Sequence, residues 1–176
     1  MQGEAALLRR AQEHDLEALG EIYDRYASAM YRYVSAQIDD RQMAEDIAGE
    51  VFLRMMEAVR KGSFARISLS AWLYRIARNL VVDYYRKRRP PTVSLESLRP
   101  PPLSPAEAPE SRVLQEHVRQ AIRQLTLDQR QVIVLRFGQK MKAQEVAQVL
   151  DKSEDAVRAL QRRALASLRR ILEEQE

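Results

Sequence analysis

The chain has 176 residues, a length that suits one or two small domains, and a formal net charge of +4. It contains no cysteine and only two histidines, which excludes disulfides and thiolate metal sites and argues against a zinc site. Glycine is scarce, with 5 residues, whereas Ala, Leu, Gln, Glu and Arg are abundant, so the composition favours an all-α fold.

No apolar run approaches the length of a membrane span, and the N-terminus lacks a signal-peptide pattern. We therefore expect a cytoplasmic protein without membrane insertion. We find no phosphate-binding loop, nucleophile signature or metal-ligand cluster, so we expect neither an enzyme nor a cofactor. The carboxylate pairs Asp39–Asp40 and Asp46–Glu50 are better explained as a turn and as an interaction face.

Residues 1–89 are expected to form an N-terminal helical domain. Apolar residues recur at helical spacing over 16–38, with Asp15 as the N-cap, and again over 43–59. The polar run 39–42 breaks the first pattern, and Lys61-Gly62-Ser63 ends the second. A loop is expected from there to about Ser70.

The next helix is the stretch SAWLYRIARNLVVDYYRKRR, residues 70–89, with one tryptophan, three tyrosines and six basic residues. Its residues fall on three faces, and we expect only one of them to be buried in so small a domain. Cations bind phosphates and aromatic rings stack on unpaired bases, so the remaining faces indicate a surface for partly unstacked nucleic acid. The alternative is that each aromatic side chain simply packs in the core.

All seven prolines lie between Pro90 and Pro109, in a segment without helical periodicity. We interpret residues 90–111 as an extended linker, in which twenty residues at ~3.1 Å each would span up to roughly 60 Å. Because two turns of DNA measure about 70 Å, the flanking domains could occupy well-separated sites on one duplex. A plain spacer without a mechanical role remains the alternative.

Residues 112–176 are expected to form a second helical domain. Thr126 and Gln129 form a capping-box pattern that begins a helix through Phe137, and Gly138 fits the position just after its end. The helix at about 142–150, the break at 151–153 and the long helix after it resemble a helix-turn-helix. We expect Ser153 to cap the long helix.

The long helix is two-sided. Its apolar side is expected to pack on Val146, Ala147 and Leu150, and comprises Val157, Leu160, Ala164, Leu168 and Ile171. Its opposite side carries arginines, which suit guanine edges and phosphate oxygens. The alternative is an amphipathic surface helix with a solvated basic face.

Three segments together resemble a known family: AEDIAGEVFLRMMEAV, WLYRIARNLVVDYYRKRR and LTLDQRQVIVLRFGQKMKAQEVAQVLDKSEDAVRALQRRALASLRRIL. They are similar to the extracytoplasmic-function (ECF, group IV) sigma factors of the sigma-70 family of bacterial RNA polymerase. The resemblance implies sigma region 2 in the first domain and sigma region 4 in the second. It also implies binding to core RNA polymerase, promoter recognition and DNA melting at the −10 element.

The resemblance assigns roles to individual residues. Those that would dock on the clamp helices of the largest polymerase subunit are Asp46, Glu50, Phe52 and Leu53. Those that would bind and melt the −10 element are Phe64, Trp72, Arg75, Arg78, Asn79, Arg86, Lys87 and Arg88. Those that would face the −35 element are Ser153, Arg158, Ala159, Arg162 and Arg163. Within the −10 set, Asn79 would hold a flipped base. Independently, Asp46, Glu50, Leu53 and Glu57 share one side of a helix, which suits a basic partner.

The chain departs from the family pattern at Ala156, Ala159 and Gln161. Gln161 stands where an apolar residue is frequent, which could alter the core register of the long helix. The resemblance further implies the flap of the second-largest polymerase subunit, promoter DNA and an anti-sigma factor as partners. A rival interpretation is a stand-alone helix-turn-helix regulator, which would leave the acidic face and the aromatic helix without a role.

Overall fold

The computed structural model describes residues 3–64, 66–88 and 110–174. This part of the chain contains eight α-helices, one π-helical turn and no strand. The proline-rich linker lies outside the described residues, apart from its last two positions, which belong to a helix. In the described residues no helix is both long and apolar enough to cross a bilayer.

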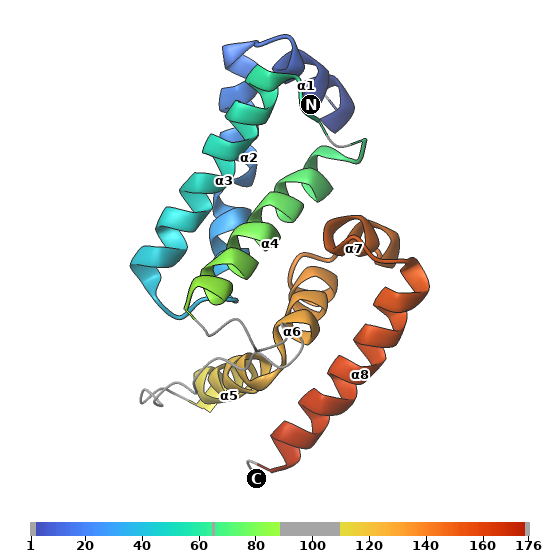
Figure 1. Ribbon diagram of the computed structural model, residues 1–176. Coiled ribbons are helices and arrows are strands. Elements are labelled where there is room, and N and C mark those ends of the chain that lie inside the picture. Colours follow the sequence, from blue (N-terminus) through green and yellow to red (C-terminus); the bar gives the residue numbers. More distant parts are fainter. Residues whose placement is uncertain (1–2, 65, 89–109, 175–176) are drawn as a thin grey trace.

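The N-terminal domain is a bundle of four helices (Figure 1). They are α1 (Glu4–Gln12), α2 (Leu16–Ser35), α3 (Arg41–Lys61) and α4 (Leu69–Lys87). Side-chain oxygens of Asp15, Asp40 and Ser68 accept backbone N–H groups at the starts of α2, α3 and α4. Gly62 adopts φ 64° just after α3, the left-handed conformation that ends many helices. The predicted cap and the predicted break between α2 and α3 are both confirmed.

Helix α1 was not predicted. Leu7 and Ala11 of this helix are fully buried, and the helix packs mainly on α2. Leu8 is partly buried against the same core, so only these few apolar residues hold α1, too few for a periodic signal over nine residues.

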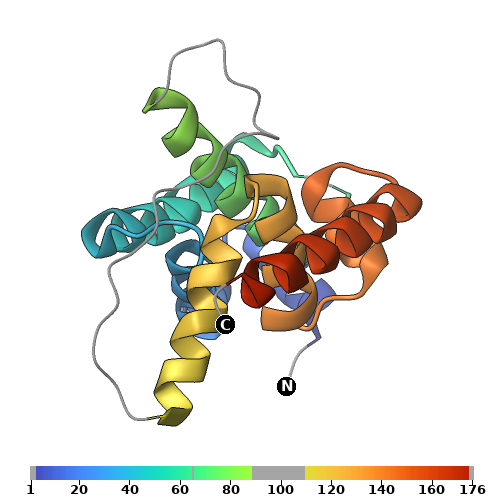
Figure 2. The same ribbon diagram turned by 90° about the horizontal axis from the view of Figure 1, so that it is seen from below.

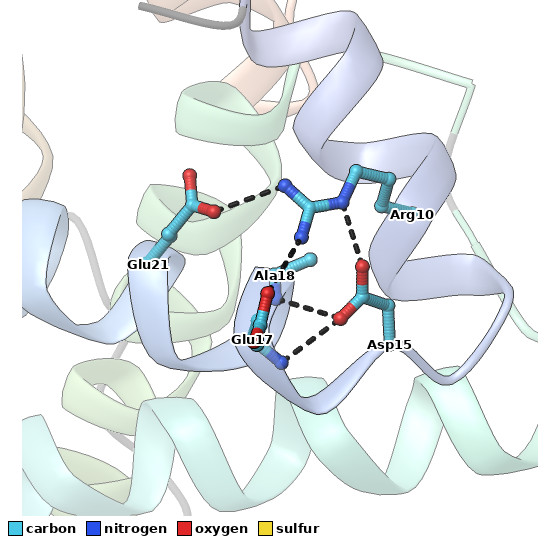
Figure 3. Close-up of polar contacts among 5 residues, drawn as sticks. All are labelled: Arg10, Asp15, Glu17, Ala18 and Glu21. Carbon is cyan, nitrogen blue, oxygen red and sulfur yellow. Dashed lines mark hydrogen bonds and ion pairs between the residues drawn. The ribbon is translucent and has the colours of Figure 1, made fainter.

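Arg10 ties α1 to the first turn of α2 (Figure 3). Its Nε lies 2.6 Å from Asp15 Oδ2, and its other nitrogens lie 2.9 Å from Glu21 and 3.9 Å from Glu17. Asp15 Oδ1 at the same time accepts the backbone N–H groups of Glu17 and Ala18. The hydrogen bond from Arg10 lowers the pKa of the Asp15 carboxyl below its usual value, and the N–H groups act in the same direction.

The C-terminal domain contains five elements. They are α5 (Glu110–Gln124), α6 (Leu127–Ile133), the π-helical turn η2 (Val134–Gly138), α7 (Ala143–Leu150) and α8 (Glu154–Glu173). The capping box of Thr126 and Gln129 is present at the start of α6. Gly138 does not end a helix in the left-handed conformation, so that prediction is wrong. The chain continues through η2, and Lys140 has φ 56° instead.

The two domains lie against each other, with α4 alongside α7 and the end of α2 near η2 (Figures 1 and 2). This contact corrects the expectation that only one face of α4 is buried. Leu73, Trp72 and Tyr74 lie on three different faces, and their exposed fractions are 0 %, 6 % and 5 %. The second domain supplies cover that the first could not supply alone.

The Arg10–Asp15 pair gives a test of the join between α1 and α2. Asp15→Asn should keep the cap, because asparagine also accepts N–H groups at this position, but it removes the ion pair. A carboxyl with a lowered folded-state pKa stabilises above its ordinary pKa, and this contribution is lost as the pH falls through the folded value. We therefore expect the variant to melt at a lower temperature than wild type at about pH 7, and the difference to shrink towards about pH 2.

Thermal unfolding followed by circular dichroism measures both differences. Glu13→Gln, which removes an exposed carboxylate near the same join, is the control and should change little at either pH. A difference for Asp15→Asn that stays equal at both pH values would show that the ion pair does not stabilise the fold.

Candidate nucleic-acid interface

Helices α7 and α8 form the expected helix-turn-helix. Val157, Leu160, Ala164 and Ile171 are all at most 8 % exposed, and α8 packs on α7 and α6. The turn passes through Asp151, which adopts φ 52°. The predicted cap is confirmed, since Ser153 Oγ accepts the N–H of Ala156 at 3.1 Å.

The outer side of α8 is basic and open to solvent. Arg158, Arg162 and Arg163 are exposed, and Ala159 between them is half-buried. Arg158 Nη2 lies 2.5 Å from Glu154 Oε1, so a phosphate or base would have to displace this exposed partner. Such exposed pairs contribute little to stability, which leaves Arg158 available at small cost.

A groove of about 540 Å³ runs beside this basic side. Beyond α8 its lining consists of Ala143 and three polar residues that the sequence did not assign to DNA, namely Arg136, Lys142 and Gln144. Lys142 and Gln144 lie at the start of α7, and Arg136 comes from η2. Only the packing of α7 across α8 brings them together, so spacing along the sequence gave no signal for them.

Gln161 does not disturb the core register. Its Oε1 accepts a hydrogen bond from Arg136 Nε at 2.8 Å, and Arg136 Nη1 donates to the carbonyl of Met141 at 2.5 Å. Leu160 beside it remains 8 % exposed. The polar residue at this position is thus paired with an arginine, and the apolar side of α8 stays where the sequence predicted it.

The residues assigned to the −10 element divide into two groups in the structure. Asn79, Arg86, Lys87 and Arg88 are exposed along α4. Arg78 lies beside Asn79, with Nη1 3.3 Å from Asn79 Oδ1. This part of α4 exposes one amide, and its C-terminal end exposes three consecutive cations.

The other group is covered. Trp72 is buried, and its ring meets that of half-buried Phe64 edge to face with centroids 6.0 Å apart. Arg75 Nε donates to the backbone carbonyl of Gln148 in α7 at 2.9 Å, and Arg75 Nη2 lies 3.8 Å from Asp151. In this conformation the second domain occupies the guanidinium that was expected to bind DNA.

A second groove, of about 510 Å³, lies between α2 and α3. Its walls include Tyr23 and Phe52, whose rings meet edge to face with centroids 4.9 Å apart. Gly49 lines it as well, and a Cβ added there would meet no atom within 4 Å. The groove is therefore a recess with aromatic walls, edged by Arg32 and Glu45, and with open space at the glycine.

The predicted acidic face of α3 borders this groove. Leu53 is 61 % exposed, and Asp46 is exposed as well. Glu50 and Glu57 each pair with a basic residue four positions later on the same helix, at 2.8 Å and 2.7 Å. A partner would thus contact the exposed side chain of Leu53 and the carboxylate of Asp46, which has no basic neighbour on its helix. It would also contact the carboxylates of Glu50 and Glu57, which form exposed ion pairs.

Comparisons with known proteins identify the family. Residues 22–90 match the family model for sigma-70 region 2, and residues 121–170 match that for sigma-70 region 4. The chain is 32% identical over 163 residues to the ECF RNA polymerase sigma factor SigX of Bacillus subtilis, covering 86% of this chain and 82% of SigX. The chain belongs to the ECF RNA polymerase sigma factors.

It is also 34% identical over 173 residues to the ECF RNA polymerase sigma factor BldN of Streptomyces coelicolor, covering 94% of this chain. The chain spans 64% of the length of BldN. The structure of CnrH in complex with the cytosolic domain of CnrY has a similar fold, with a TM-score of 0.75 and 24% identity. That likeness covers 98% of this chain and 99% of CnrH.

Membership fixes the general role of the chain. It is an RNA polymerase sigma factor, a non-catalytic subunit that directs promoter-specific initiation of transcription. Each family segment falls within one of the two helical domains, so α4 lies in region 2 and the helix-turn-helix lies in region 4. The rival interpretation as a stand-alone helix-turn-helix regulator is excluded by the match to region 2.

Ser153 allows helix stability and DNA contact to be separated. Ser153→Ala removes the cap of α8 and should lower the free energy of unfolding by about 1 kcal/mol. Ser153→Asp keeps a capping oxygen and should remain as stable as wild type, because a carboxylate also suits a helix N-terminus. Its negative charge should nevertheless weaken binding to promoter DNA if this end of α8 faces a phosphate.

Urea denaturation measures the stabilities, and filter binding of promoter DNA by the holoenzyme measures the contact. Equal DNA binding by Ser153→Asp and wild type would place the start of α8 away from the DNA backbone.

Proposed function

We propose that this sigma factor binds core polymerase through α3, captures the −10 element on α4 and reads the −35 element with α8. The observation that supports the proposal best is the placement of exposed cations. They gather at the C-terminal end of α4 in region 2 and lie on one side of α8 in region 4, the two segments that the family shares.

At the −10 element, a base extruded from the duplex costs a few kcal/mol. Asn79 can donate to and accept from the edge of such a base, and its exposed position on α4 supports this role. Arg86, Lys87 and Arg88 lie farther along the helix, where they would hold the phosphates of the same strand. Phosphate contacts fix the strand, and the amide selects the base.

Trp72 remains among the proposed −10 residues, but its side chain also packs in the domain core. Because its side chain is 6 % exposed and packs on Phe64, replacing it with alanine would cost about 3–5 kcal/mol of stability. Such a variant would test folding as much as DNA binding. Asn79 is the better probe of base capture.

At the −35 element, Arg158, Arg162 and Arg163 would enter the major groove with α8, with Ser153 at the helix start and Ala159 beside them. The structure adds Arg136, Lys142 and Gln144 to the same groove wall. The positive charges of Arg136 and Lys142 suit phosphates flanking the bases that α8 contacts, and the amide of Gln144 can hydrogen-bond there. This arrangement supplies affinity and register and melts no base pairs.

The acidic border of the α2–α3 groove would contact the clamp helices of the largest polymerase subunit. Asp46, Glu50 and Leu53 are accessible, whereas Phe52 would act from the groove wall. Region 4 would contact the flap of the second-largest subunit. Acting on polymerase and promoter DNA, the protein would work in the cytoplasm.

An anti-sigma factor is the further partner that we propose. Tyr23, Leu53 and Met56 are 53 %, 61 % and 48 % exposed, an uncovered apolar surface around the α2–α3 groove. A protein that covered this surface would compete with polymerase for the same residues. CnrH, which shares the fold, is seen with the cytosolic domain of CnrY.

The proposed base capture is tested with Asn79→Ala. We expect promoter binding in the closed complex to stay near the wild-type level, because Asn79 makes no contact with duplex DNA in this scheme. Open-complex formation should fall about tenfold, since a base-edge contact contributes about 1–3 kcal/mol. Permanganate reactivity of unpaired thymines, on a promoter found by run-off transcription of genomic fragments with core enzyme, measures opening.

Gln115→Ala, which removes an exposed amide on α5, is the matched control and should open DNA normally. Wild-type opening by Asn79→Ala would refute base capture by this residue. Failure of the wild-type chain with its own core enzyme to start any transcript would refute the proposed function as a whole.

Polymerase docking is tested with Asp46→Lys. The reversed charge should repel a basic partner surface, and affinity for core polymerase should fall at least about tenfold, because like charges opposed across an interface cost several kcal/mol. Glu13→Lys makes the same charge change at the end of α1 and should bind normally. Titration of fluorescently labelled protein with core enzyme gives both affinities, and equal values for the two variants would move the docking surface away from α3.

A further inference from the structure

Helix α3 carries an apolar stripe on the side that the proposed function gives to polymerase. The spacing i, i+3, i+4 and i+7 places residues on one face of a helix, and four residues of α3 follow it: Gly49, Phe52, Leu53 and Met56. Phe52 lines the α2–α3 groove, whereas Leu53 and Met56 are 61 % and 48 % exposed. Figure 1 shows α3 on the side of the first domain that faces away from α7 and α8. The stripe is therefore open to a partner.

Met56 differs from the other methionines in its exposure. The chain has six methionines and no cysteine, so thioethers are its only sulfur atoms. Five of the methionines lie in the described part of the chain. Met30, Met55 and Met141 are 0 %, 1 % and 6 % exposed, and Met43 is partly buried against the core. Because oxidation of sulfur follows exposure, Met56 is the first of these five that an oxidant in solution reaches.

Oxidation changes what this side chain offers to a partner. A peroxide transfers one oxygen atom to a lone pair of the thioether sulfur: the O–O bond breaks, an S–O bond forms, and the second oxygen leaves as water. The sulfur is oxidised by two electrons and the peroxide is reduced by two. The product, methionine sulfoxide, is polar, whereas the thioether is a flexible apolar group that adapts well to a binding surface.

The position of Met56 makes this change a matter of docking and not of folding. Leu53 and Met56 lie three residues apart on one face, so a partner that covers one of them also covers the other. In the thioether form both add apolar area to the contact. A sulfoxide brings a strong hydrogen-bond acceptor into it, and covering a polar group that finds no donor is unfavourable. The neighbouring Met55 faces the core, so the core keeps its own methionine when Met56 is oxidised.

We propose that Met56 is an oxidation site, at which conversion of the thioether to the sulfoxide weakens docking on core polymerase. This inference rests on the proposed function, because it takes the exposed side of α3 as the polymerase contact. The oxidised protein keeps its fold and docks poorly, and reduction by methionine sulfoxide reductases restores docking. An oxidant thereby lowers promoter-directed transcription through a chain that has no thiol.

Hydrogen peroxide is the probe. The full-length protein is treated until peptide mapping by mass spectrometry shows one added oxygen on Met56 in most molecules, and the peroxide is removed before core enzyme is added. Titration of the fluorescently labelled protein with core enzyme gives the affinity before and after treatment. We expect Met56 to be oxidised before Met30, Met55 and Met141. We expect the affinity to fall about fivefold or more, with an unchanged circular dichroism spectrum.

Two variants assign the effect to one sulfur atom. Met56→Leu has no thioether at this position and should lose no affinity on treatment. Each protein is compared with its own untreated sample, so a change in the starting affinity of this variant does not enter. Met43→Leu removes a partly buried methionine from the same helix and should stay as sensitive to peroxide as wild type. Incubation of oxidised wild type with sulfoxide reductases for both epimers should restore its affinity.

Unchanged affinity of wild type that carries the sulfoxide at Met56 overturns the proposal. An equal loss of affinity in Met56→Leu also overturns it, because the responsible oxidation would then lie elsewhere in the chain. Oxidation of Met30, Met55 or Met141 ahead of Met56 does the same. If untreated wild type does not bind core polymerase, the proposed function fails and this proposal fails with it, so the two failures are told apart before any peroxide is added.

Discussion

Helix α4 has more apolar and aromatic surface than its own domain can cover. Leu73, Ala77 and Val81 are fully buried along one stripe, and Trp72 and Tyr74 are almost fully buried on further faces. Burying such residues is the main favourable contribution to folding, so this helix needs neighbours on several sides. Helices α2 and α3 supply some of them, and α7 supplies another. The contact of α4 with α7 therefore adds cover from the second domain to that supplied by its own domain.

The same requirement links folding to function in region 2. A helix that must hold a separated DNA strand needs exposed rings, amides and cations, whereas a stable domain needs its rings covered. In this chain both demands are met on one helix, where exposed Asn79, Arg86 and Lys87 accompany the buried rings of Trp72 and Tyr74. Burial raises the pKa of Tyr74 to about 12, consistent with a phenol that stays a neutral donor to Gln139.

Much of the fold could be predicted from local sequence. Caps at Asp15 and Ser153, the capping box at Thr126 and the apolar side of α8 all depend on residues within one or two helical turns, where spacing along the chain fixes spacing in space. The family resemblance likewise depended on contiguous segments. By contrast, the π-helical turn before Lys140 is set by how α6 must meet α7, and Gly138 alone gave a misleading signal. The pairing of Arg136 with Gln161, the neighbours of Arg75 and the burial of Arg130 are all contacts between residues far apart in sequence. A single sequence holds no record of which distant residues meet, so these parts of the candidate site could only be seen in the folded chain.

The glycine in the wall of the α2–α3 recess bears on how related sigma factors in one cell could each bind only their own inhibitor. Gly49 sits in mid-helix, where glycine weakens a helix by about 1 kcal/mol relative to alanine, although nothing within this chain requires the space beside it. A mutation to a bulkier residue would therefore be tolerated by the fold and would change only the shape offered to an incoming protein. An inhibitor with a protruding side chain could insert it into this recess. The same side chain would clash with a related sigma factor whose recess is filled by a larger residue at this position. A single substitution at this position could thus make two duplicated sigma factors bind different inhibitors without destabilising either fold.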